Sequence, residues 1–365
     1  MPELPEVQAL ADFLDARARG RRIERVQMLS FTALKSLAPP PSALAGRVVA
    51  HCTRRGKFLL VLTVPANAPD EPSGGRSEQG AARGAGSVAD GGPAVDQLWL
   101  AVHFALAGWL RWYEPGLGDQ LADPRGHGPG ARGATADERP AELRAVPRRV
   151  PAPGVPGRGP GTGITGRLLR PGGPVAMRVE LEGGAGFDLT EAGTRKRLAI
   201  HVVRAPEDVP AIARLGIDPL DPAFDADALG RLLAGRTGQL KHLLADQALI
   251  AGVGNAYSDE ALHAARLSPF RPAGNLAPGE VAGLHAALLG VLREALARNE
   301  GVPPAALKDG KRAAMRVHGR TGLACPVCGD TIREVAFAER SLQYCPTCQT
   351  GGRPLADRRM SRLLR

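Results

Sequence analysis

The sequence lacks any long apolar run, and it lacks the cysteine pattern of a secreted protein. The longest apolar stretch, around residues 98–110, carries His103 and is too short to span a bilayer. Acids and prolines interrupt the first residues before any apolar run, which excludes a secretory signal. Four of the five cysteines form two pairs that are close in sequence near the carboxyl end, a pattern typical of metal ligands. The fifth, Cys52, is expected in the core. We therefore expect a cytoplasmic protein without membrane attachment.

The charge is unbalanced, with 47 Lys and Arg against 37 Asp and Glu and a net charge of +10. This excess favours a polyanionic partner, nucleic acid first and an acidic membrane surface second. An arginine-rich composition drawn from a high-GC genome would give the same excess, so charge alone leaves both explanations open. At 365 residues the chain is long enough for two ordinary domains.

Apolar patterns predict a β-rich first half behind one leading helix. The helix is expected over residues 5–19, and Gly20 is expected to end it. The predicted strands cover residues 23–29, 48–52, 58–64, 98–102, 109–113 and 175–181. Two segments, about 66–96 and 115–173, are so rich in Gly, Pro, Ala, Ser and Arg that they cannot bury a core. We predict that both are disordered insertions at hairpin tips, because each begins after a strand and ends before one.

The second half is predicted to be helical, with a short tail that carries the cysteines. Apolar residues recur at spacings of three and four over residues 225–233, 239–245, 258–265 and 278–298. No internal repeat is present. The fold class is therefore expected to be α+β with more than one domain.

The tail contains C-P-V-C at residues 325–328 and C-P-T-C at residues 345–348, with sixteen residues between the pairs. Two such pairs can supply four thiolates to one tetrahedral Zn²⁺ and so fold a β-hairpin that has no core of its own. The predicted ligands are Cys325, Cys328, Cys345 and Cys348. Because four thiolates close the coordination shell, we expect one structural zinc and no catalytic metal.

Two further segments suggest phosphate contacts. In the G-V-G-N-A-Y run at residues 252–257, the glycines allow a close backbone approach, and Asn255 is expected to cap a following helix. A helix N-terminus of this kind suits a phosphate, although a tight interhelical turn would explain the glycines equally well. Lys57 opens a strand in R-R-G-K-F, where it would either face a DNA groove or simply be solvated.

The amino terminus reads M-P-E-L-P-E. Removal of Met1 is expected before a residue as small as Pro2, and it would leave a secondary amine. An α-amino group titrates near ~8, so part of it is an unprotonated nucleophile at neutral pH. Glu3 could then move protons, and Glu6 could join a buried polar network. The same residues would also serve merely to begin and cap a helix.

Together these segments resemble the formamidopyrimidine-DNA glycosylase and endonuclease VIII family of DNA repair enzymes. The resemblance covers the chain outside the two insertions. It rests on M-P-E-L-P-E-V, R-R-G-K-F-L-L, the H-F-A-L-A-G-W-L-R segment from His103, L-G-I-D-P-L from residue 215, G-V-G-N-A-Y, and the cysteine hairpin preceded by V-H-G-R.

The resemblance implies domains with stated boundaries. A catalytic β-sandwich domain would occupy residues 1–205, and a helix-two-turns-helix DNA-binding domain would occupy residues 206–316. A zinc finger would cover residues 317–353, and a basic tail would cover residues 354–365.

The resemblance also implies a bifunctional enzyme, acting as a monomer on damaged double-stranded DNA, that excises a flipped base and then cleaves the strand as an AP lyase. Pro2 would attack C1′ and form a Schiff base, with Glu3 as the proton donor or shuttle and Glu6 in support. The catalytic set is thus Pro2, Glu3, Glu6 and Lys57. The DNA-binding set is Lys57, His103, Leu106, Lys241, Asn255 and Arg340.

Three segments differ from the family pattern or match it loosely. Leu106 stands where a methionine is common, as an apolar wedge for the gap left by the flipped base. Residues 190–198 replace the D-P-R-R-F turn, so the preferred lesion and the opposite base are not specified. A lesion-covering loop is expected within residues 301–316. Two alternatives remain: a catalytically weak protein that binds damaged or abasic DNA, and a zinc-bearing RNA or ribosome-associated protein.

Overall fold

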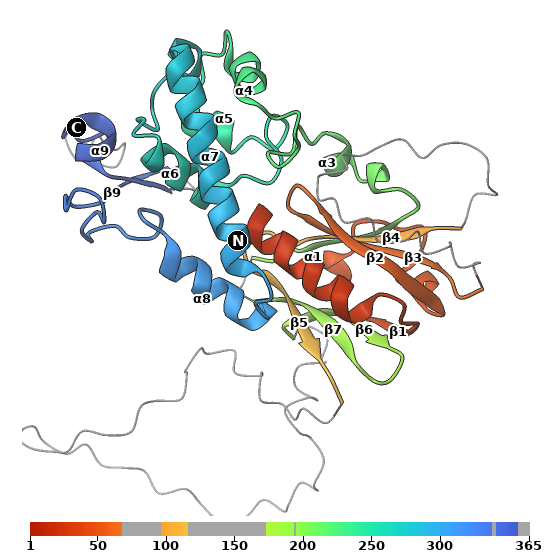
Figure 1. The fold of residues 1–365 in the computed structure, drawn as a ribbon. Helices are drawn as coiled ribbons and strands as arrows, with labels where there is room; N and C mark the ends of the chain where they lie inside the picture. Colours follow the sequence, from red (N-terminus) through yellow and green to blue (C-terminus); the bar gives the residue numbers. More distant parts are fainter. Residues whose placement is uncertain (68–95, 116–172, 193–194, 338–340, 357–365) are drawn as a thin grey trace, which may run out of the picture.

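The computed structural model describes residues 1–67, 96–115, 173–192, 195–337 and 341–356, and it divides into a β-rich half and a helical half (Figure 1). The amino terminus lies where the two halves meet, beside α1, α7 and α8 (Figure 1). The β-rich half and the helical half with its cysteine hairpin confirm the predicted α+β class.

The β-rich half begins with a helix and continues with strands. Its elements are α1 (Leu4–Ala18), β1 (Ile23–Met28), β2 (Arg47–Arg55), β3 (Phe58–Pro65), β4 (Leu98–His103), β5 (Gly108–Tyr113), β6 (Val175–Leu181), β7 (Gly186–Glu191) and β8 (Ala199–Val203). Single 3₁₀ turns lie between β1 and β2, at Phe31–Ala33 and Pro41–Leu44. The leading helix and six of the strands match the predicted spans to within a few residues, whereas β7 and β8 were not predicted.

Two four-stranded antiparallel sheets form this half, in the orders β1-β6-β7-β5 and β2-β3-β4-β8. One apolar cluster includes Leu10 of α1, Val102 of β4 and Phe187 of β7, all of them almost completely buried. The two sheets and α1 therefore share one core, in which each large apolar side chain contributes about 1.5–3 kcal/mol. Cys52 is buried in the same core, as predicted.

The two predicted insertions connect strands in different ways. The first joins β3 to β4, which pair directly with Thr63 opposite Leu98, so it does lie at a hairpin tip. The second joins β5 to β6, but β7 lies between these strands in the sheet. The prediction of a hairpin tip is wrong for the second insertion, because its two ends lie at opposite ends of β7. Most of residues 66–96 and 115–173 lie outside the described residues.

The helical half contains α3 (Pro210–Ala213), α4 (Ala226–Leu233), α5 (Leu240–Leu244), α6 (Asn255–Ala264), α7 (Pro278–Asn299) and α8 (Pro304–Ala314). Further 3₁₀ turns lie at Pro206–Asp208 and Ala273–Asn275. The carboxylate of Asp225 accepts a hydrogen bond from the N–H of Ala228 and so caps α4. Tyr257, Leu262 and Leu288 lie in the core of this half, which α4, α5, α6 and α7 build together.

Residues 304–314 form the helix α8, where a lesion-covering loop was expected. Leu307 of α8 is completely buried in the core of the β-rich half, whereas Met315, just after the helix, is buried in the core of the helical half. This helix therefore packs against both halves of the molecule (Figure 1).

The carboxyl-terminal part is a two-stranded hairpin, β9 (Arg333–Ala336) and β10 (Ser341–Tyr344), followed by α9 (Pro346–Thr350). It lies beside α6, far from the β-rich half (Figure 1). Within the described residues, no helix has the length and apolar character needed to cross a membrane.

Candidate active site

The carboxylate of Glu3 binds the N-terminus of α6, 250 residues further along the chain. Its Oε2 accepts a hydrogen bond of 2.7 Å from the N–H of Gly254, and its Oε1 accepts one of 2.9 Å from the N–H of Ala256. The first turn of a helix leaves such N–H groups without partners in the helix itself. The prediction that Asn255 caps this helix is therefore wrong: Gly254 is the N-cap residue, and Glu3 from the other half supplies the carboxylate.

The two glycines of the G-V-G-N turn make room for the amino-terminal segment. Gly252 has a φ of +91°, and a β-carbon there would lie 2.8 Å from Cβ of Leu4. A β-carbon at Gly254 would lie 2.5 Å from Cδ of Glu3 and 2.7 Å from Nζ of Lys57. The N–H of Leu4 also donates a hydrogen bond of 3.0 Å to the carbonyl of Gly252. The close approach predicted at these glycines is thus one between the two halves of the protein.

Opposing effects decide the charge of Glu3. Complete burial would raise its pKa, but the charges of Lys311 and Lys57 and the N–H of Ala256 lower that pKa to about 2. Glu3 is therefore ionised at neutral pH. A negative charge is favourable in this position, because the N-terminus of α6 carries partial positive charge.

Glu6 lies next to Glu3 and is almost completely buried. Its Oε2 accepts hydrogen bonds from the N–H of Glu3 at 2.8 Å and from Nζ of Lys311 at 2.7 Å, while its Oε1 accepts one from the hydroxyl of Tyr257. Burial, followed by the charge of Glu6, raises the pKa of Tyr257, so this residue stays a hydrogen-bond donor. Glu6 thus belongs to the buried polar network that the sequence predicted.

Lys311 of α8 was missed by the sequence analysis, and it is the cation of this network. Its Nζ lies 3.9 Å from Oε1 of Glu3 and 4.6 Å from the ring centre of Tyr257. Nothing in the local sequence marks Lys311, because its partners lie more than 50 residues away. α8 reaches this position because its first turn is held on β5, where Nε1–H of Trp109 donates a hydrogen bond to the carbonyl of Pro304.

Lys57 lies between β2 and β3, is largely buried, and contributes to the field at Glu3. Burial, followed by the charge of Lys57, lowers the pKa of His103 to about 4, so this imidazole is neutral at pH 7. His103 also packs against Phe58, with 4.9 Å between the ring centres. Lys57 and His103 were predicted from separate segments of the sequence. In the structure they are neighbours, and the charge of Lys57 acts on both His103 and Glu3.

Lys241 and Asn255, both predicted to bind DNA, form side-chain hydrogen bonds with other residues of the protein. Nζ of Lys241 donates to the carbonyl of Asn255, the hydroxyl of Ser258 and the carboxylate of Asp259, at 2.5–2.8 Å. Nδ2 of Asn255 donates to the carbonyl of Ser341 in β10 at 2.8 Å. Lys241 is therefore buried and holds the first turn of α6, and Asn255 ties that turn to the zinc hairpin.

Leu106 lies apart from this network, in the turn between β4 and β5. Leu106 is 65% exposed. Glu191 organises the segment at 190–198, because its Oε1 accepts hydrogen bonds from the N–H groups of Arg197 and Leu198. Residues 193–194 of that segment and Arg340 lie outside the described residues.

The two cysteine pairs come together, as the predicted zinc site requires. Sγ of Cys325 lies 3.9 Å from Sγ of Cys348, and Sγ of Cys328 lies 3.3 Å from Sγ of Cys345. Four thiolates at about 2.3 Å from a tetrahedral zinc lie about 3.8 Å apart, so this donor set fits the metal. Bound there, the zinc would supply a structural cross-link between the two knuckles.

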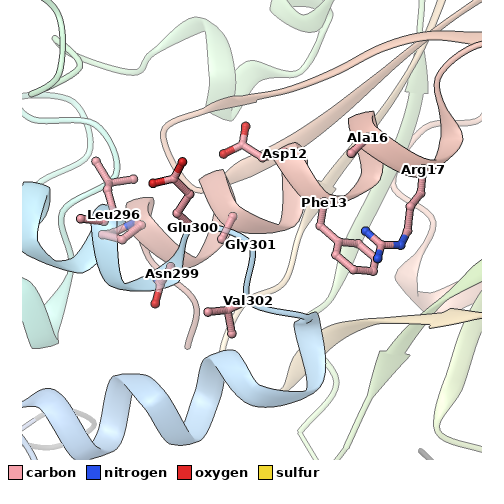
Figure 2. Close-up of a pocket in the computed structure, with 12 residues that line it drawn as sticks. Asp12, Phe13, Ala16, Arg17, Leu296, Asn299, Glu300, Gly301 and Val302 are labelled. Atoms are coloured by element: carbon pink, nitrogen blue, oxygen red, sulfur yellow. The ribbon is translucent and has the colours of Figure 1, made fainter.

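A hollow of about 460 Å³ lies elsewhere, between α1 and the segment that joins α7 to α8 (Figure 2). Asp12 and Phe13 line it from α1, and Asn299, Glu300 and Val302 line it from the other side (Figure 2). None of the predicted catalytic residues reaches it, so this hollow is separate from the network around Glu3.

Three family models match the chain. They are the formamidopyrimidine-DNA glycosylase N-terminal domain over residues 1–145, the formamidopyrimidine-DNA glycosylase H2TH domain over residues 215–303, and a zinc finger found in FPG and IleRS over residues 322–351. A formamidopyrimidine-DNA glycosylase of Symbiobacterium thermophilum is 32% identical over 361 residues, which cover 96% of this chain and 89% of that protein. An uncharacterised formamidopyrimidine-DNA glycosylase-like protein of Mycobacterium tuberculosis is 58% identical over 151 residues, 41% of this chain and 94% of its own length.

Solved structures share the whole fold. The MutM (Fpg) protein of Thermus thermophilus superposes with a TM-score of 0.62 at 27% identity, over 97% of this chain and 100% of that one. A Lactococcus lactis Fpg in complex with DNA containing N7-benzyl-Fapy-dG gives 0.64 at 19% identity, over 96% and 100% of the two chains. At 19% identity, the similarity to the Lactococcus lactis structure concerns the fold alone.

Because the pKa of Glu3 is lowered in the folded protein, the free energy of unfolding should depend on pH. The folded pKa of about 2 lies below the ordinary 4.5, so the contribution of Glu3 is complete above the ordinary value and is lost as pH falls towards 2. The difference corresponds to roughly 3 kcal/mol at neutral pH. In calorimetry from about pH 6 to about pH 3, we expect the wild-type melting temperature to fall more steeply than that of Glu3→Gln. Glu182→Gln, a change at an exposed carboxylate, should follow the wild type.

Gly254 should tolerate no side chain. In Gly254→Ala the new β-carbon would overlap Glu3 and Lys57, so we expect a loss of roughly 1–3 kcal/mol in the free energy of unfolding. Gly290→Ala is the matched control, because a β-carbon at this position of α7 meets nothing within 4 Å. Equal stability of the two variants in urea unfolding would contradict the tight contact described above.

Proposed function

The chain belongs to the formamidopyrimidine-DNA glycosylase family, and we propose that it is a bifunctional DNA glycosylase and AP lyase that excises damaged, oxidised bases. We propose that it acts as a monomer on damaged double-stranded DNA, in the cytoplasm at the nucleoid. The observation that carries the proposal is the position of the amino terminus. Pro2 is buried beside Glu3, and the charges of two carboxylates and two lysines act on the amino group of the preceding Met1.

In the proposed reaction, Met1 has been removed and the secondary amine of Pro2 attacks C1′ of the damaged nucleotide. The bond from C1′ to the base breaks, and the base leaves with a proton. The nitrogen now bonded to C1′ expels O4′: the C1′–O4′ bond opens, O4′ takes up a proton, and C1′ becomes part of an iminium. The iminium draws electrons from C2′, so a proton can be lost there and the 3′-phosphate eliminated. A second elimination of the 5′-phosphate would complete the β/δ sequence. Only a chain terminus can present a secondary amine in this way.

Glu3 and Glu6 would serve this chemistry with different protonation roles. Because the pKa of Glu3 is lowered to about 2, Glu3 would begin as a carboxylate and accept a proton before it donates one. Glu6 would stay fixed between Lys311 and Tyr257 and keep Glu3 in place.

Lys311 would make the amine reactive near neutral pH. In the structure the amino group is that of Met1, and burial followed by the charge of Lys311 lowers its pKa. Nζ of Lys311 also lies 3.4 Å from the carbonyl oxygen of Met1. For the Pro2 amine, Glu3 and Glu6 would act in the opposite direction and raise the pKa, but burial and Lys311 are the larger effects. We therefore expect a larger unprotonated fraction than in a free terminus.

DNA contacts would surround this centre. Lys57, Asn255 and Arg340 would hold phosphates on either side of the lesion. His103, which is neutral, would donate a hydrogen bond to DNA but contribute no charge there. The 65% exposure of Leu106 supports a role as the wedge that fills the gap left by the flipped base. Lys241 would act on DNA through Asn255, whose helical turn it holds.

The proposal is tested by borohydride trapping on duplex DNA that contains an abasic site or an oxidised base. Borohydride reduces the iminium, so we expect a covalent protein–DNA adduct with the wild type. The adduct should vanish in Pro2→Gly and in any protein that keeps an amino-terminal tag. Binding of the same duplex without an adduct on any lesion tried would favour the alternative, a binding protein without lyase activity.

Lys311→Met should shift the pH dependence of trapping. Because the lysine charge disfavours the protonated amine, its removal should raise the amine pKa, and the acidic limb of the trapping rate should move to higher pH. We expect a severalfold slower reaction at neutral pH that recovers in alkaline buffer. Lys308→Met is the matched control: Lys308 has the smallest effect at the amine, and its variant should shift the profile less. An unshifted profile in Lys311→Met would contradict the role proposed for this lysine.

A further inference from the structure

One buried histidine of α6 lies against the cysteine cluster, and the sequence analysis assigned it no role. His263 is 3% exposed, and its Nε2 lies 3.3 Å from Sγ of Cys325. The ligand atoms of His263, Cys325, Cys345 and Cys348 all lie within 4.8 Å of one another, and Cys328, which is not in that set, has its Sγ 3.3 Å from Sγ of Cys345. A fifth donor therefore adjoins a site that needs only four.

Two roles are open to this imidazole, and its second nitrogen distinguishes them. Nδ1 of His263 is buried and has no hydrogen-bond partner among the described residues. If Nε2 bound the metal, Nδ1 would have to carry the proton, and a histidine that binds a metal almost always gives that proton to a nearby acceptor. If Nε2 carries the proton instead, Nδ1 leaves only a lone pair unpaired, and an unpaired acceptor is tolerated more readily than an unpaired donor.

The spacing of the sulfurs supports the second role. Between the two pairs, the separation of 3.9 Å from Cys325 to Cys348 matches a four-thiolate zinc site, and the separation of 3.3 Å from Cys328 to Cys345 keeps the fourth thiolate at the cluster. Four thiolates complete the shell without the histidine. We propose that His263 is an outer-sphere residue of the zinc site, whose Nε2–H donates a hydrogen bond to the Cys325 thiolate and so helps the protein to retain zinc.

The physical reason lies in the charge of the site. Four thiolates around one Zn²⁺ carry a net charge of −2, and a buried N–H aimed at one sulfur stabilises that charge without competing for the metal. His263 thereby acts as a positioning residue, because it fixes the orientation of Cys325 but does not bind the ion.

The same hydrogen bond links the zinc to the candidate active site through α6. Glu260, one turn before His263, accepts hydrogen bonds from the N–H groups of Val317 and His318, which precede the first cysteine pair. At the other end of α6, Asn255 donates to Ser341 of the hairpin, and the N-terminus of the helix holds Glu3. One face of α6 thus contacts the zinc finger along its whole length, and His263 is its contact with a metal ligand.

The test uses the full-length zinc protein and three variants. His263→Phe keeps the volume of the ring and removes the donor, and His263→Gln returns an amide N–H at a similar reach. His285→Phe is the matched control, since His285 of α7 is a part-buried histidine of the same half whose Nε2 contacts the carbonyl of Phe224. Zinc affinity is measured by competition with a chromogenic chelator, and coordination by the visible spectrum of the cobalt-substituted protein.

We expect the four-thiolate cobalt spectrum in the wild type and in every variant. Zinc affinity should fall roughly tenfold or more in His263→Phe, recover at least in part in His263→Gln, and stay unchanged in His285→Phe. These readouts do not depend on enzymatic activity, so they test the role of His263 whether or not the proposed lyase reaction occurs.

Three outcomes would overturn the proposal. The first is wild-type zinc affinity in a folded His263→Phe protein. The second is a wild-type cobalt spectrum of three thiolates and one nitrogen that changes in His263→Phe, because the histidine would then be a direct ligand. The third is a His263→Gln protein with affinity as low as that of His263→Phe, since the restored donor would then have no effect.

Discussion

The hydrogen bonds from the N-terminus of α6 to the carboxylate of Glu3 organise the rest of the candidate active site. They join the first residues of the β-rich half to the centre of the helical half, so neither half forms the site alone. An ionised carboxylate buried this deeply requires compensating charge, and Lys57 and Lys311 supply it from β2–β3 and from α8. A β-carbon at Gly254 would overlap the carboxylate of Glu3, and one at Gly252 would overlap the side chain of Leu4, so both glycines allow the amino-terminal segment to approach the helix.

The residues that hold the amino terminus in place are the same residues to which the proposed reaction assigns chemical roles. The hydrogen bonds that hold the amino-terminal segment against α6 also help to keep Glu3 charged, and Lys311 binds Glu6 beside it. The zinc hairpin does not reach Glu3 but packs on the same helix. Asn255 contacts it at one end of α6, and His263 contacts it at the other. α6 is therefore the element that contacts both the zinc finger and the amino terminus.

Local patterns predicted well where the signal is itself local. The leading helix, six strands and the helices α4, α5, α6 and α7 follow from apolar periodicity, because each buries one face in a core. The strands β7 and β8 were missed. The sequence of β7, G-F-D-L-T-E, alternates between apolar and polar residues over only four positions, and its polar residues are buried as well. The second insertion was misassigned because strand order is invisible in the sequence: β7, which follows the insertion, pairs between the two strands that the insertion joins.

The sequence by itself determined the chemical groups. They are an amino-terminal Pro2 followed by two acids, a glycine turn, Lys57 and His103, and four cysteines at the spacing of a zinc site. Their types and spacings carry that information because each chemistry needs those groups. Only the tertiary structure decided their partners. It assigned the cap of α6 to Glu3 and not to Asn255, buried Lys241 inside the protein, and brought in Lys311 and His263. These roles depend on distances between residues far apart in the chain, and such distances exist only once both cores have packed.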